Sequence, residues 1–139
     1  MAGKELNTNG CRGEWGTRRG APAPALFANG LPASPNPAYS LQAQVVASNY
    51  VIFAFASQTA NVPLGNGCTL LVDDTQMIAT HLVQANGSGA ATWNLPVPAG
   101  LAATDVACQA FELVVGGPIV NLLAASNGLR IRAAGTGCP

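Results

Sequence analysis

The single histidine is the side chain of this sequence best suited to acid–base chemistry near neutral pH. His81 lies in the segment Thr80-His81-Leu82, with no acidic residue close to it in the chain. A histidine acts as a general base only where the fold brings it a nucleophile and an orienting group. No serine lies in a Gly-x-Ser-x-Gly pattern. We therefore expect a hydrogen-bonded strand histidine, no catalytic residues and no enzyme activity.

Asp73-Asp74 is the only pair of adjacent carboxylates. Neighbouring residues of a strand point to opposite faces, so the two side chains can share a ligand only at a turn. Calcium would need more oxygen ligands, from Asp105 or from backbone carbonyls, and the spaced acidic residues of a dedicated calcium loop are missing. We expect a solvated turn here, with no metal and no cofactor.

The four cysteines, Cys11, Cys68, Cys108 and Cys138, form an even set without a Cys-x-x-Cys pair. This spacing does not fit zinc, and the spread over the chain predicts two long-range disulfides in an oxidising compartment. The N-terminal residues lack the apolar core of a signal peptide, which argues against that compartment. Spacing alone leaves all three pairings open.

The composition is poor in charge: 9% of the residues are charged, 49% are hydrophobic and the net charge is zero. A typical soluble domain has about 25% charged residues. Such a chain offers few groups for proton transfer and no long-range field for nucleic acid, and its surface is poorly protected against self-association. No apolar run is long enough for a membrane-spanning helix. We expect neither nucleic acid binding nor a membrane span.

Alternating apolar residues separated by glycine and proline predict an all-β chain. Residues 38–46 alternate cleanly, and residues 50–57 are apolar on both faces, which is typical of a central strand. Further strands are predicted at residues 77–84, 119–124 and 129–133. In the last of these, Leu129 and Ile131 alternate with Arg130 and Arg132, so one face should be buried and the other exposed. We expect a single β-sandwich of about nine strands, immunoglobulin-like or a jelly-roll variant. The predicted parts are an extended N-terminal arm (residues 1–20), the sandwich (residues 21–134) and a cysteine-containing tail (residues 135–139).

Two surface features could bind or carry sugars. Trp15, Trp93, Tyr39 and Tyr50 could form a stacking platform, although core packing is the usual role of such residues. Asn86-Gly87-Ser88 is an N-x-Ser sequon in a predicted loop, so Asn86 is a candidate glycosylation site.

Several short motifs, mostly turn sequences, follow one another along residues 10–133. They are Gly10-Cys11, Gly30-Leu31-Pro32, residues 36–41, residues 63–72, residues 95–98, Gln109-Ala110 and residues 126–131. In this order and spacing they resemble a module of large secreted proteins from planctomycete-type bacteria.

The resemblance implies an extracellular β-sandwich without assigned catalytic residues. It implies a disulfide between Cys11 and Cys68, which occupy the recurring Gly-Cys positions, and leaves Cys108 with Cys138. The alternative joins Cys68 to Cys108 inside the sandwich and Cys11 to Cys138 at its ends. The chain departs from the family in its charged arm, and its last residues resemble the opening of a further module.

These observations predict a non-enzymatic structural subunit that self-assembles into an extracellular filament or surface layer. A terminal segment of one copy would complete a sheet edge of the next. The alternative is a secreted carbohydrate- or protein-binding module, or a virion surface protein. The expected partners are copies of the chain itself, with glycans as a further candidate. The predicted interface residues, in the arm and near the C-terminus, are Arg12, Trp15, Arg18, Arg19, Arg130 and Arg132.

Overall fold

The computed structural model describes residues 4–6, 11–15, 24–29, 38–65, 68–96, 104–116, 119 and 122–133, most of which lie in β-strands. The one helix among them is a short 3-10 turn, η1 (Asp74–Gln76). The strands are β1 (Lys4–Leu6), β2 (Cys11–Trp15), β3 (Ala25–Asn29), β4 (Ser40–Gln44), β5 (Tyr50–Ala56), β6 (Thr59–Gly65), β7 (Cys68–Val72), β8 (Met77–Gln84), β9 (Ala90–Asn94), β10 (Thr104–Leu113) and β11 (Leu123–Ala133).

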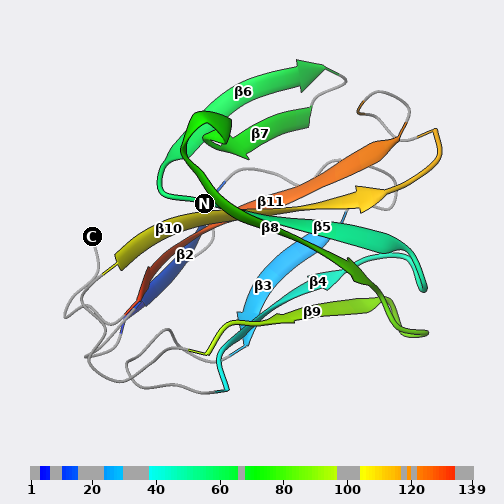
Figure 1. Ribbon diagram of the computed structural model, residues 1–139, viewed down its shortest axis with the longest axis horizontal. Coiled ribbons are helices and arrows are strands. Elements are labelled where there is room, and N and C mark those ends of the chain that lie inside the picture. The colour runs from blue at the N-terminus through cyan, green and yellow to red at the C-terminus, as the bar shows by residue number, and fades with distance from the viewer. Residues whose placement is uncertain are drawn as a thin grey trace.

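The strands form three antiparallel groups arranged as layers (Figure 1). The main sheet has six strands in the order β1-β2-β11-β10-β5-β8. A second sheet, β3-β4-β9, lies against one face of the main sheet, and the β6–β7 hairpin lies over the opposite face. The predicted all-β sandwich is therefore confirmed.

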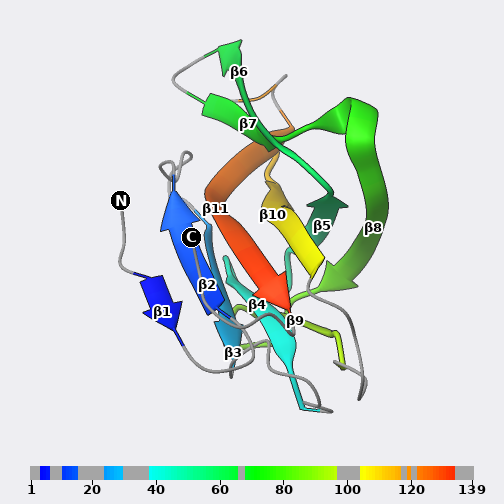
Figure 2. The same ribbon diagram turned by 90° about the vertical axis from the view of Figure 1, so that its left-hand side faces the viewer.

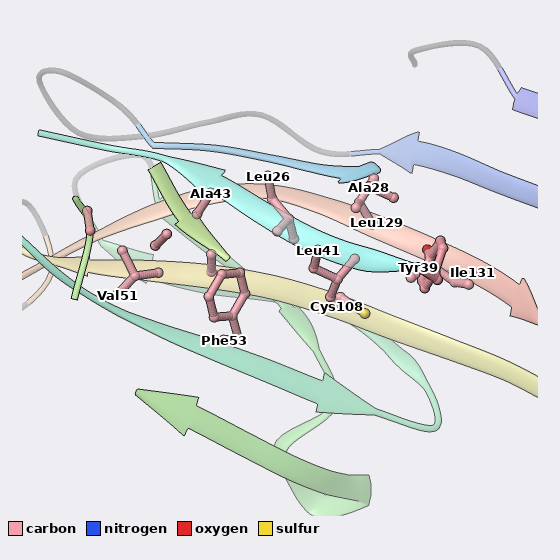
Figure 3. Packing of buried hydrophobic residues seen from close by; sticks show 13 residues of the cluster. Leu26, Ala28, Tyr39, Leu41, Ala43, Val51, Phe53, Cys108, Leu129 and Ile131 are labelled. Atoms are coloured by element: carbon pink, nitrogen blue, oxygen red, sulfur yellow. The ribbon is translucent and has the colours of Figure 1, made fainter. Parts of the chain in front are cut away.

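The principal core lies between the main sheet and the second sheet (Figure 3). Leu41 and Ala43 of β4 face Val51 and Phe53 of β5, and none of the four is more than 1% exposed. On β11 the predicted alternation is confirmed, because Leu129 is buried in this core while the neighbouring Arg130 is exposed. Burial of these apolar side chains is the main force that holds the two sheets together.

The opposite face of the main sheet is also apolar where the β6–β7 hairpin covers it. This explains why β5 is apolar on both faces, as the sequence predicted: Phe53 contributes to the principal core and Ala54 to a smaller cluster under the hairpin. Two such clusters lie there, one of Ala54, Ala56, Val72 and Ala107, and one of Cys68, Ile119 and Ala125.

Strand β11 contains the predicted strand 129–133 and the last two residues of the predicted strand 119–124, and it runs without a break through the segment between them. The register of β11 with β10 shifts between Gln109, opposite Gly128, and Phe111, opposite Ala125. Two residues of β11 therefore lie opposite the single residue Ala110, which is the arrangement of a β-bulge. The polar Ser-Asn-Gly segment is accommodated inside the strand by this bulge, which is why its turn-like composition was misleading.

Part of the predicted arm belongs to the main sheet. Strand β2 pairs with the outer edge of β11, and β1 pairs with β2. Figure 2 shows these two strands at one end of the sheet and β8 at the other end. No sequence pattern predicted strands in residues 1–20, and the structure adds two. The predicted tail, residues 135–139, lies outside the described residues.

Candidate assembly interface

The pairing of β2 with β11 brings together predicted interface residues from the two ends of the chain. The register places Arg12 opposite Ile131, Trp15 opposite Gly128, and Cys11 opposite Arg132. Arg130, opposite Gly13, is exposed. Arg18 and Arg19 lie outside the described residues. In the described part of the chain, the basic residues all lie on β1, β2 and β11, at one end of the main sheet.

The bulge in β11 carries a side chain that joins the two sheets. Asn127 Oδ1 accepts a hydrogen bond from the Leu26 backbone N–H at 2.9 Å, and Asn127 Nδ2 donates to the Leu26 carbonyl at 3.0 Å. The amide thereby substitutes for a peptide group of a neighbouring strand, with both backbone groups of one β3 residue satisfied. This contact holds β3, the edge of the second sheet, against β11.

A second amide performs the same task on the opposite face. Gln109 of β10 is fully buried. Its Oε1 accepts from the Leu71 N–H at 2.8 Å, and its Nε2 donates to the carbonyls of Thr69 at 2.9 Å and Ser126 at 3.1 Å. The Ser126 hydroxyl in turn accepts from the Ala110 N–H at the bulge. Gln109 therefore anchors β7 to the main sheet.

A buried carboxylate fixes the loop between β4 and β5. Glu112 is fully buried, and its Oε2 accepts from the Val46 N–H at 3.1 Å and from Asn49 Nδ2 at 2.7 Å. Its Oε1 is buried without a hydrogen-bond partner among the described residues. The same loop contains Ser48, whose φ of 67° lies in the left-handed region. Gln109, Asn127 and Glu112 were not predicted as anchoring residues. For Gln109 and Glu112 the available signal was a polar residue inside a largely apolar strand.

The other end of the main sheet is an open edge. Strand β8 pairs with β5 on one side and has no strand on the other side in the part of the chain that the structure describes. His81 of β8 is exposed and stacks on Trp93 of β9, with ring centroids 5.0 Å apart and an interplanar angle of 22°. Trp93 also contacts Phe55 and Phe53, at 5.4 and 6.0 Å between centroids. His81 is thus a strand residue, as predicted, but its contact is an aromatic stack.

The four aromatic residues of the predicted stacking platform do not form one surface. Tyr39 is buried in the principal core, Trp93 packs partly against it, and Tyr50 is 46% exposed on β5. Trp15 is on β2, at the far end of the main sheet.

The acidic pair forms a turn, as expected. Asp73 precedes η1, and its Oδ1 accepts from the Thr75 hydroxyl at 2.7 Å and from the Thr75 N–H at 2.9 Å. These two bonds lower the pKa of Asp73 below its ordinary value. Asp74 is exposed, and no group of three potential metal ligands occurs among the described residues. The arrangement stabilises a turn.

Two of the four cysteines are described with their side chains, and both are free thiols. Cys68 lies in the cluster with Ile119 under the hairpin, whereas Cys108 lies in the principal core. The two are in different clusters and are not bonded to each other, so the structure forms none of the predicted disulfides at these positions. Complete burial raises the pKa of the Cys108 thiol well above its ordinary value. Cys138 lies outside the described residues.

The predicted sequon lies in the turn between β8 and β9. Asn86 is exposed, but its Oδ1 accepts from the backbone N–H groups of Ser88 at 2.9 Å and Ala90 at 3.1 Å. The side chain therefore has a role in shaping this turn.

The comparisons with known proteins do not place the chain in a family. No family model matches it, and no curated protein matches it. In the described part of the chain, no helix is long and apolar enough to cross a membrane.

Proposed function

We propose that the chain is a non-enzymatic structural subunit that self-assembles into an extracellular filament or surface layer. The observation that carries the proposal is the position of the arm: β2 joins the main sheet only at its end, along the edge of β11. A strand in this position can leave its own β11 and pair with the β11 of a neighbouring copy, making the same backbone hydrogen bonds. Exchange of the arm would link each copy to the next, head to tail.

The proposed localisation and relatives follow from the same sequence features. A near-neutral, charge-poor surface favours association between copies. The ordered motifs support kinship with secreted β-sandwich modules of planctomycete-type bacteria. Two of those motifs contain the anchors of this fold, Gln109 and Asn127.

Arm exchange can be tested with one substitution that alters the backbone of β2. Gly13 of β2 is paired with Arg130 of β11, and proline at this position would remove its N–H and restrict the backbone. We expect Gly13→Pro to abolish filaments while the sandwich keeps its circular dichroism spectrum. Gly13→Ala keeps the N–H and is the matched control. Filaments that persist in the proline variant would contradict arm exchange.

The second candidate function is a carbohydrate-binding module, and the stack of the exposed His81 on the half-buried Trp93 favours it. Aromatic rings at an exposed surface can stack on the apolar face of a sugar. A glycan array probed with the native protein and with His81→Ala tests it. Binding that depends on His81, together with a stable monomer, would replace the structural proposal.

A further inference from the structure

Strand β8 is an edge strand without the usual protection against pairing. It is eight residues long, Met77–Gln84, and contains no charged residue and no proline. Natural edge strands are normally blocked by charge, proline, bulges or covering segments. Among the residues that the structure describes, the only such device is at one end, where the register with β5 shifts between Ala79, opposite Phe55, and Met77, opposite Ala56. The remainder of the strand is regular.

The side chains on this edge are unusually apolar for a surface. Ile78 is 57% exposed, Leu82 is 58% exposed and the adjacent Tyr50 of β5 is 46% exposed. Leu82 lies opposite Ile52 and Tyr50 lies opposite Gln84, so Leu82 and Tyr50 lie near the end of β8, whereas Ile78 lies near its start. An apolar surface next to unpaired backbone groups favours pairing with another strand.

We infer that β8 pairs with β8 of a second copy, antiparallel and about a two-fold axis at Thr80. The inference deepens the proposed self-assembly and rests on it for the premise that the partner is another copy. An axis normal to the sheet keeps each face on its own side, so residues equally distant from Thr80 become neighbours across the junction. Ile78 of each copy then lies opposite Leu82 of the other, and the two threonines meet at the axis.

The side chains select this register over its neighbours. With the axis at Thr80, the His81 ring lies opposite the small Ala79 of the other copy. An axis at His81 would instead set the two imidazoles against each other and leave Ile78 opposite Gln84. An axis at Leu82 would leave Ile78 without an apolar partner. The Thr80 register alone pairs each of the two most exposed aliphatic residues of β8 with the other.

The charge distribution also fits a copy of this strand. Both β8 strands are uncharged, so their pairing places no like charges opposite each other. The carboxylates of Asp73 and Asp74 precede β8, and antiparallel pairing puts those of the two copies at opposite ends of the junction. A strand of the charged arm would instead bring either Lys4 or Glu5 to the face that carries the exposed Ile78 and Leu82. A second β8 is therefore the better occupant.

The pairing would join two six-stranded main sheets into one continuous sheet. It would also place a second copy beside His81 of the His81–Trp93 stack, so it competes with the carbohydrate-binding alternative. Combined with arm exchange at the other end of the sheet, it gives each subunit two different contacts.

A cysteine at the axis tests the register directly. Thr80→Cys, in the full chain with Cys11 and Cys138 changed to serine, should form a disulfide-linked dimer of twice the 14.0 kDa chain mass under mild oxidation. Gln84→Cys in the same background is the matched control, because it is exposed on the same strand but does not meet itself in this register. Efficient cross-linking at Gln84→Cys, or none at Thr80→Cys, would overturn the inference.

A charged substitution at the β8–β8 junction tests how strongly this contact contributes to dimerisation. Leu82→Lys would bury a lysine against Ile78 of the other copy and should weaken dimerisation, measured by analytical ultracentrifugation, at least tenfold. Val115→Lys is the control, since Val115 is 94% exposed at the β10–β11 turn. Filaments without the Thr80 cross-link would overturn the β8 contact and leave the proposed function standing. Cross-linked dimers without filaments would support the β8 contact and contradict the filament.

Discussion

Two amide side chains, the buried Gln109 and the half-buried Asn127, do in this protein what strand pairing does elsewhere. Gln109 and Asn127 each supply one acceptor and one donor to the backbone of a different layer. An unpaired backbone N–H or C=O in such a place would cost about 1–3 kcal/mol. The two amides therefore fix the position of β7 and β3 on the main sheet more specifically than apolar contact alone can.

Removing the Gln109 amide should be strongly destabilising. Gln109→Ala leaves the Leu71 N–H and the Thr69 carbonyl without their partner and opens a cavity. We expect a loss of about 2–4 kcal/mol in the free energy of unfolding, measured by urea denaturation. Gln58→Ala, at an exposed glutamine, should change it by no more than about 0.5 kcal/mol. Equal effects of the two changes would contradict the anchoring role.

The Asp73 turn predicts a pH dependence at acid pH. The Thr75 hydroxyl and N–H bond the carboxylate and hold its pKa in the folded protein below the ordinary 3.8. The stabilisation is therefore fully present above pH 3.8 and is lost as the pH falls through the lowered pKa. Thr75→Val should raise the pKa of Asp73, observed by NMR titration, whereas Thr92→Val should not. An unchanged pKa in Thr75→Val would refute this cause.

The two buried thiols predict a labelling pattern. Burial raises the pKa of Cys108, so its thiol stays protonated and shielded in the native protein. Without any reductant, iodoacetamide should modify Cys68 and Cys108 only after denaturation, as resolved by peptide mass spectrometry. If either stays unlabelled in denaturant until a reductant is added, it forms a disulfide, and the free-thiol description is contradicted.

The β4–β5 loop depends on one carboxylate from β10. Glu112 binds both the Val46 N–H and the Asn49 side chain through a single oxygen. Glu112→Ala should cost about 2–4 kcal/mol and accelerate hydrogen exchange of the Val46 amide. Glu112→Gln keeps an acceptor oxygen and should retain most of the protection. Slow Val46 exchange in the alanine variant would show that the loop does not need this anchor.

The strands that sequence patterns predicted best are those with an apolar face and ordinary turns. Residues 77–84 were expected as a strand and form β8, and residues 50–57 correspond to β5 (Tyr50–Ala56). β6 (Thr59–Gly65) was missed because Pro63 and Gly65 are typical of turns. The arm strands were missed because they carry charges and no alternation, and tertiary pairing with β11 decides their structure.

Less of the candidate interface could be predicted. Arg130 was expected to be exposed because it alternates with Leu129 and Ile131, and this is confirmed. The position of Arg12 opposite Ile131 depends on the register between β2 and β11, and no local sequence pattern contains that register. The cysteine count predicted disulfides, but burial of Cys68 and Cys108 in separate clusters depends on the packing of three layers.

The main sheet has two chemically different ends. The arm end carries the basic residues of the described chain, whereas the β8 end is uncharged and apolar. Among the described residues the two ends do not pair with each other, and four strands separate them. Other copies can pair with both ends, through arm exchange at one end and β8 pairing at the other. An assembly with two such contacts per subunit extends as an open polymer where its rotation does not close into a ring.

The most direct test of self-assembly is electron microscopy of the native, unreduced full-length protein across a concentration series. We predict regular filaments or ordered layers above a threshold concentration, and their loss in Gly13→Pro but not in Gly13→Ala. Dispersed single particles of the native protein at every concentration would contradict it.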